Sequence, residues 1–189
     1  LSLCGLLQGQ LRFMSQYFNI LGVASNGINN QLSQVSKLEG ISTYAVEMTR
    51  KITPLKDLKA VWQLYLLFKR EKPFIVHSHT PKAGTISMIA AKLAGVPHRL
   101  HTIAGLPLLE ATGIKRMVLN TVEKVTYACA TKIYPNSHGL KTIILDHKFT
   151  KETKLKVIAH GSSNGIDTAY FNPNYDNLLG HTLELRATL

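Results

Sequence analysis

Acidic residues are scarce in this sequence of 189 residues. Asp and Glu number 11 against 22 Lys and Arg, which gives a formal net charge of +11 with histidine neutral. The paired carboxylates on which ordinary glycoside hydrolases depend are not evident, and this disfavours that class of enzyme. The surplus of positive charge favours polyanionic partners instead: nucleic acid, an anionic membrane surface or phosphorylated small molecules.

Cysteine is also rare. Cys4 and Cys129 are too few and too far apart for a CxxC site or a disulfide-rich scaffold. Cys129 lies in an apolar run over residues 125–130. This position favours a buried thiol in a reducing compartment.

Long apolar runs are missing as well. None approaches the ~18 residues that a membrane-spanning helix needs, and the best candidate, residues 87–96, is interrupted by Lys92. The first seven residues lack a basic region and are too short for a signal peptide. The sequence has no initiator Met, so we expect it to be part of a longer protein.

What remains is the composition of a folded domain. Apolar residues make up 45% of the chain and charged residues 17%, with 13 Gly and 7 Pro. These values exclude a disordered, collagenous or coiled-coil chain. The length suffices for one sizeable core and is short for two full domains.

Short β-rich runs alternate with helical runs along the chain. We expect strands at 20–24, 41–46, 74–79, 99–103, 132–134 and 155–159, with an opening strand lost or frayed before residue 5. We expect helices at 28–38, 54–72, 81–94 and 114–129 and after Ser137, two of them opened by Thr-Pro pairs. This alternation predicts an α/β fold with an open, doubly wound, mostly parallel sheet of about six strands.

The helix that follows Thr53-Pro54 has a strong apolar pattern. Its core-facing stripe is predicted to include Leu55, Leu58, Trp62 and Phe68. The aromatic residues are therefore interpreted as core side chains and not as platforms for stacking nucleic acid bases.

Ligands of such sheets bind beyond the carboxyl ends of the strands. The segments at these ends are rich in polar residues and glycine, so function is sought there. They are 25–27, 49–51, 79–82, 104–105, 136–137 and 160–165.

Histidines form the first notable group. His77 and His79 point to one face of a predicted strand, and His98 and His101 lie on a probable neighbour. Four imidazoles suggest a metal site, but no carboxylate accompanies them, so we expect none. His77 is interpreted as a hydrogen-bonded core residue, whereas His79 and His101 lie near strand ends, within reach of a sugar hydroxyl or a proton-transfer partner.

The helix start after His79 is a candidate anion site. Its free backbone N–H groups lie beside Lys82 and Gly84, and Gly84 is equally well explained by close packing of the helix on the sheet. Neither a Walker loop nor GxGxxG is present, which disfavours P-loop enzymes and nicotinamide dehydrogenases. Two basic pairs, Arg50-Lys51 and Lys115-Arg116, either hold phosphates or form a solvated face.

These loops together resemble the N-terminal domain of retaining glycosyltransferases of family 4, of the bacterial capsular and exopolysaccharide type. The similarity covers about residues 3–173, and the order and spacing of the motifs carry it. The matching segments are 72–84, 90–97, 101–107, 134–137 and 164–168.

The resemblance implies one half of a GT-B architecture. Residues 1–167 would form the Rossmann-like acceptor-binding domain, with the family's opening strand at best partly present around residues 3–9. Residues 168–189 would be an interdomain linker or tail, and the nucleotide-sugar domain would be absent. His101 would be the catalytic cleft histidine, while His79, Lys82, Arg50, Gly84, Gly105, Asn136, Ser137 and Asn164 would line the acceptor cleft.

The implied function is transfer of a sugar from a nucleotide-sugar to a lipid-linked or polysaccharide acceptor, with no metal or other cofactor. The intact enzyme would be cytoplasmic and peripheral at the anionic inner face of the cell membrane. Two alternatives stay open at this point: a basic module that binds nucleic acid, and a nucleotide-sugar epimerase of GT-B fold.

Overall fold

A computed structural model describes residues 2–49 and 53–162 of the chain. These residues contain five strands, all paired in parallel. β1 (Leu21–Ala24) pairs with β2 (Ser42–Ala45), while β3 (Ile75–Ser78), β4 (His98–Ile103) and β5 (Lys132–Pro135) form a second sheet in the order β3-β4-β5. The predicted parallel α/β class is confirmed.

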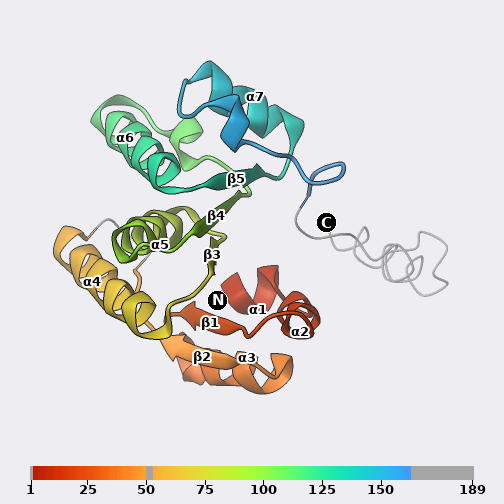
Figure 1. Ribbon diagram of the computed structural model, residues 1–189. Helices are drawn as coiled ribbons and strands as arrows, with labels where there is room; N and C mark the ends of the chain where they lie inside the picture. Colours follow the sequence, from red (N-terminus) through yellow and green to blue (C-terminus); the bar gives the residue numbers. More distant parts are fainter. Residues whose placement is uncertain (1, 50–52, 163–189) are drawn as a thin grey trace, which may run out of the picture.

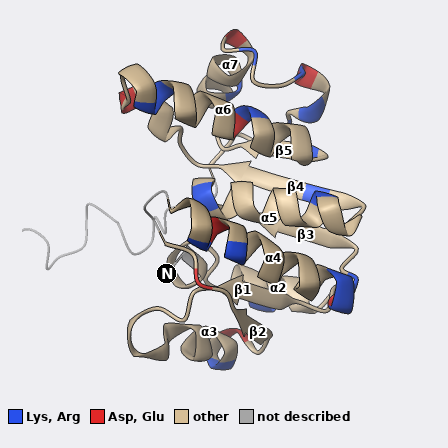
Figure 2. Cartoon of the chain, turned by 90° about the vertical axis from the view of Figure 1, so that its left-hand side faces the viewer, with Lys and Arg blue, Asp and Glu red and all other residues tan. Residues whose placement is uncertain are grey.

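Helices connect successive strands (Figure 1). α3 (Gln31–Glu39) joins β1 to β2, and α4 (Pro54–Glu71) leads from β2 to β3. α5 (Pro81–Ala94) and α6 (Gly113–Cys129) lead on to β4 and β5, and α7 (His138–Asp146) follows β5. α4, α5 and α6 lie side by side in one layer (Figure 2). The remaining elements are α1 (Ser2–Leu6), α2 (Gln10–Ser15) and the 3-10 turns η1 (Ile28–Asn30), η2 (Pro107–Glu110) and η3 (Glu152–Lys154).

The helix ends follow local sequence signals. α4 and α5 both begin with proline at the first helical position, directly after a threonine. α5 ends at Gly95, whose φ of +80° is a left-handed conformation that glycine adopts without strain. These boundaries match the predicted ones closely because a proline or a glycine fixes each of them.

The core lies between the three-stranded sheet and the layer of α4, α5 and α6. Met88, Ala90, Tyr127 and Ile133 are fully buried there, and Ile144 of α7 belongs to the same core cluster. Small residues in α5 allow the helix to approach the sheet closely. This close approach governs the geometry of the site.

Residues 2–6, where the opening strand was expected to be lost or frayed, form the helix α1. One predicted strand is wrong. At 155–159, Leu155 makes a single bridge to Ile133, and no strand forms there within the described residues. The chain leaves the sheet because Ala159 has a φ of +50° and Gly161 a φ of +90°, neither of which an extended strand can adopt.

The predicted core stripe of α4 is also partly wrong. Leu64, Leu67 and Phe68 are buried, but Leu55 is 85% and Trp62 58% exposed. Apolar residues occur on two opposite sides of this helix, so its periodicity does not identify the buried side. Contact with α5 determines which side of α4 is buried.

No helix within residues 2–49 and 53–162 is both long and apolar enough to cross a bilayer.

Candidate functional site

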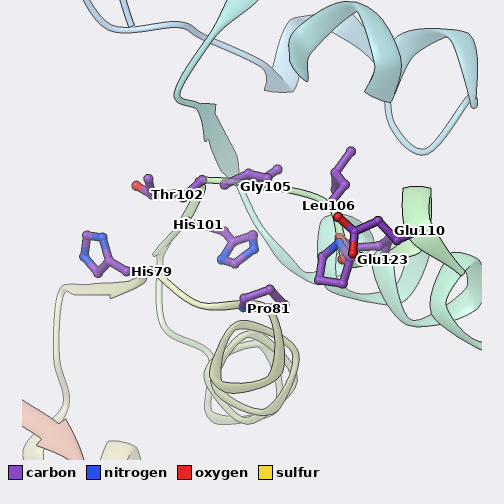
Figure 3. A pocket seen from close by; sticks show the side chains of 11 residues that line it. His79, Pro81, His101, Thr102, Gly105, Leu106, Glu110 and Glu123 are labelled. Carbon is purple, nitrogen blue, oxygen red and sulfur yellow. The ribbon is translucent and has the colours of Figure 1, made fainter. Parts of the chain in front are cut away.

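A cavity of about 390 Å³ opens at the carboxyl end of β4, where doubly wound sheets bind ligands. Its walls come from the exits of β3 and β4, the first turn of α5, η2 and α6 (Figure 3). The lining residues are His79, Pro81, His101, Thr102, Ile103, Ala104, Gly105, Leu106, Pro107, Glu110 and Glu123.

His101, predicted as the catalytic residue, lies at the inner wall of this cavity. β4 holds it, and only 2% of its surface is exposed. Its Nδ1 lies 2.8 Å from Oγ of Ser78 on the neighbouring strand, which fixes the orientation of the ring. Burial lowers the pKa of His101 to about 4, so the imidazole is neutral at physiological pH.

Gly84 in α5 packs directly against this ring. A Cβ atom at Gly84 would lie 2.9 Å from Nδ1 of His101 and closer still to Cε1. Of the two interpretations of Gly84 that the sequence left open, the structure therefore supports close packing of helix on sheet. The packing partner is a predicted site residue, so Gly84 acts by positioning His101.

His79 leaves β3 at the other side of the cavity. Its ring lies 4.1 Å from that of His77, centroid to centroid. His77 Nε2 lies 2.8 Å from Thr102 Oγ1, so His77 is hydrogen-bonded as predicted, although its side chain reaches the surface and is not a core group. Burial lowers the pKa of His79 to about 4, which makes this histidine neutral as well.

Two acidic residues of the cavity were missed by the sequence analysis. Glu110 in η2 and Glu123 in α6 both line it. Glu123 is only 7% exposed, and burial raises the pKa of its carboxyl, an effect that the nearby Tyr127 hydroxyl partly offsets. The signal in the sequence was the position of Glu123 in α6, four residues before Tyr127 on the buried side of that helix.

Lys82 lies in the first turn of α5, but its charge is directed toward α4. Its Nζ lies 2.7 Å from Oδ1 of Asp57 and donates to Thr49 Oγ1 at 3.0 Å. Burial on its own raises the pKa of Asp57, but the hydrogen bonds from Lys82 and Thr53 outweigh it and the pKa is lowered. Lys82 thus ties α4 to α5, and it is not among the residues that line the cavity.

Three further predicted residues, Gly105, Asn136 and Ser137, follow β4 or β5 at the same edge of the sheet and have different surroundings. Gly105 lines the cavity. The backbone N–H of Asn136 donates to Ile103 O at 3.0 Å, which ties the segment after β5 to the end of β4. Ser137 caps α7, its Oγ accepting from Leu140 N at 3.1 Å. Arg50 and Asn164 lie outside the described residues.

No basic side chain lines the cavity. Its histidines are neutral and neither Lys nor Arg lines it, whereas two acidic residues, Glu110 and Glu123, do. Within the described part of the chain, no three His, Cys, Asp or Glu residues are grouped so as to hold a metal ion. Neutral imidazoles, carboxyls and the Thr102 hydroxyl together suit hydrogen bonding to a ligand rich in hydroxyls.

The fold is the parallel α/β fold of one Rossmann-like half of the GT-B architecture. The same fold is found in a glycosyltransferase from Rickettsia africae, with a TM-score of 0.61 and 20% identity over 98% of this chain and 44% of that one. It is also found in a UDP-N-acetylglucosamine 2-epimerase, with a TM-score of 0.60 and 20% identity over 82% of this chain and 44% of that one. Fold alone therefore does not separate a transferase from an epimerase.

Sequence comparison gives the family. Residues 12–137 match the sequence profile of the "Glycosyl transferase 4-like" family, and the chain belongs to that family. It is 37% identical over 174 residues to a capsular polysaccharide biosynthesis glycosyltransferase, CapM, of Staphylococcus aureus, covering 92% of this chain and 44% of the relative. It is 32% identical over 176 residues to an Escherichia coli UDP-Gal:alpha-D-GlcNAc-diphosphoundecaprenol alpha-1,3-galactosyltransferase, covering 89% of this chain and 44% of the relative. The chain thus spans less than half the length of both relatives.

Proposed function

We propose that this chain is the acceptor-binding half of a glycosyltransferase that moves a sugar from a nucleotide-sugar to a lipid-linked or polysaccharide acceptor. The reaction would serve the synthesis of capsular or extracellular polysaccharide. Both curated relatives are glycosyltransferases, and one of them acts on a diphosphoundecaprenol-linked sugar. These relatives favour transfer over epimerisation, and no comparison supports a nucleic-acid-binding module.

The cavity at the end of β4, which neither Lys nor Arg lines, is the observation that carries this proposal. A free phosphate would require cationic partners, and the cavity walls supply none. The terminal sugar of an acceptor is neutral and offers hydroxyls to His79, Thr102 and Glu123. We assign the cavity to this sugar, and the phosphates of a lipid-linked acceptor would lie outside it.

His101 is proposed to act as the catalytic histidine through its ring at the cavity wall. The hydrogen-bonded Ser78 and the packed Gly84 hold the ring in one position, and burial keeps it neutral. A neutral, oriented imidazole can hydrogen-bond to a sugar hydroxyl without bringing a charge into the site. Retention of anomeric configuration and independence from metal are further expectations of this proposal.

The 189 residues on their own are expected to bind the acceptor without transferring sugar, because family resemblance places the nucleotide-sugar site in another domain. We further propose that the intact enzyme works as a peripheral protein at the inner face of the cell membrane. The net charge of +11 supports attraction to an anionic leaflet.

Titration of the chain with a short-chain prenyl-diphosphate-linked N-acetylglucosamine tests the assignment of the cavity. We expect binding that His79→Ala weakens about fivefold, since a good hydrogen bond contributes about 1 kcal/mol. His98→Ala is the matched control, because His98 begins the same strand as His101 but lies at its opposite end. Equal weakening by both variants, or no binding by the unmodified chain, contradicts the proposal, as does sugar transfer by the chain alone.

A further inference from the structure

The two glutamates of the cavity have no basic counterpart. Glu110 and Glu123 lie on the same side of it, and His101 lies between them and His79 (Figure 3). Among the residues that the structure describes, neither carboxyl takes part in an ion pair. Buried acids in folded chains normally have a cationic or hydrogen-bonding partner. The absence of a cation beside these two acids is therefore a property of the site that calls for an explanation.

Glu123 forms the buried part of this acidic wall. Only 7% of its surface is exposed, yet it lines the cavity. Tyr127, one turn further along α6, is fully buried, and its hydroxyl forms no hydrogen bond within the described part of the chain. This hydroxyl is near enough to act on the Glu123 carboxyl, whose pKa it lowers against the larger effect of burial. The carboxyl therefore has no cation to neutralise it and is available to a ligand that donates a hydrogen bond.

Glu110 forms the solvent side of the same wall. It lies in η2, is exposed, and lines the cavity. η2 packs against α6, and this contact keeps Glu110 and Glu123 on one side of the cavity. A ligand that enters thus meets one exposed and one buried carboxyl.

Carboxyl oxygens accept hydrogen bonds from O–H and N–H groups, which sugars with hydroxyl or N-acylamino substituents supply. A carboxylate on the ligand would instead be placed beside two acidic side chains, with neither Lys nor Arg among the lining residues to neutralise it. A repulsive contact of this kind separates related ligands more sharply than attractive contacts alone.

We propose that Glu110 and Glu123 determine which acceptor sugars the cavity takes: it binds sugars that present hydroxyl or N-acyl N–H groups and excludes hexuronic acids. A free ammonium group would satisfy the same carboxyls, so the exclusion applies to anionic sugars and not to amino sugars. The inference rests on the proposed function, because it requires an acceptor sugar in this cavity. It adds the class of sugar and the residues that select it.

Two lipid-linked probes that differ only at C6 of the sugar test the inference. They are a short-chain prenyl-diphosphate-linked glucose and the same carrier linked to glucuronic acid. The diphosphate is identical in both, so the ratio of their dissociation constants isolates the effect of the carboxylate. By calorimetry near neutral pH, we expect the unmodified chain to bind the glucosyl probe about tenfold more tightly.

The variant Glu110→Gln with Glu123→Gln should reduce this preference to about twofold, because the glucuronosyl probe no longer meets acidic side chains. Glu71→Gln with Glu152→Gln is the matched control. It removes the same charge from two exposed carboxyls that pair with Arg70 and Lys141 and do not line the cavity, so the tenfold preference should remain.

Glu110→Arg provides a test by gain of binding. Glu110 is exposed, so we expect the variant to fold, and circular dichroism checks this. The new guanidinium can pair with the carboxylate of the probe, and the preference should shift toward the glucuronosyl probe. Stronger attraction of the diphosphate would affect both probes equally and would leave their ratio unchanged.

Equal affinity of the unmodified chain for the two probes would overturn the inference, as would a preference that persists in the double glutamine variant. If His79→Ala still weakened binding of the glucosyl probe in that case, the proposed function would stand without this specificity. Binding of neither probe would overturn the proposed function and this inference with it.

Discussion

At the scale of single residues, the contact between Gly84 and His101 sets the position of the proposed catalytic ring. α5 can lie this close to β4 only because residue 84 has no side chain. Ser78 fixes the ring from the adjacent strand through a hydrogen bond of 2.8 Å. Small and polar residues thus orient a histidine that the folded chain holds neutral.

Replacing Gly84 by alanine should lower the free energy of unfolding by about 1–3 kcal/mol, because the new methyl group overlaps the His101 ring. Urea denaturation measures the change. Gly139→Ala is the control, since a methyl group there meets only Ser137 Oγ at 3.9 Å, and it should stabilise α7 by about 0.5–1 kcal/mol. Similar effects of the two variants would show that residue 84 does not contact His101.

Glu123→Gln should stabilise the chain at neutral pH. Burial raises the pKa of the Glu123 carboxyl in the folded state, so above the unfolded value of about 4.5 its ionisation works against folding. Glutamine keeps the shape and removes that cost, which is on the order of 1 kcal/mol. The gain should be larger at pH 8 than at pH 5, and equal urea midpoints of variant and parent at pH 8 would contradict this.

At the scale of elements, residues at the helix ends determine where a helix begins and ends. They do not determine which side of the helix is buried. Pro54, Pro81 and Gly95 fix ends of α4 and α5 wherever these helices pack. Which side of α4 is buried depends on its neighbour α5, and this is why Trp62 was misplaced by its periodicity.

Ser137→Ala should cost about 1 kcal/mol, since Ser137 Oγ accepts the N–H of Leu140 at the start of α7. Thr142→Ala in the same helix is the control, because its exposed hydroxyl bonds only to the backbone of its own preceding turn, at His138 O. We expect the control to change the free energy of unfolding by less than about 0.5 kcal/mol. Thermal unfolding of both variants distinguishes a capping role from a general loss of hydroxyl groups.

At the scale of the whole molecule, buried histidines should make stability depend on pH. Burial lowers the pKa of His101 to about 4, below the ordinary value of 6.5. The unfolded chain therefore takes up the proton first, and stability is lost as the pH falls from 6.5 toward 4. His101 should account for about 1–2 kcal/mol of lost stability between pH 7 and pH 5.

Urea denaturation of the chain at these two pH values measures this loss, with His101→Asn as the comparison. The variant is expected to be less stable at pH 7 but to show a shallower dependence on pH. A dependence that is unchanged in the variant would show that His101 does not titrate as a buried neutral group.

The sequence alone determined the parallel α/β class, the order of helices and strands, and the loops in which to look for a site. These features follow from hydrophobic periodicity, from proline and glycine at helix ends, and from the rule that ligands bind at carboxyl ends of strands. It also resembled the glycosyltransferase family that comparison then established, and His79, His101 and Gly105 were among its proposed residues. These features depend on residues that are close together in the chain, so they can be predicted from the sequence alone.

Only the tertiary structure determined which residues the packing of helices and strands brings together. Glu123 reaches the cavity because α6 packs against η2, which follows β4, and Lys82 is directed to Asp57 because α4 starts beside α5. Leu155 makes one bridge instead of opening a strand, and the backbone turns at Ala159. Each outcome depends on residues far apart in the chain or on backbone conformations that the sequence pattern does not encode.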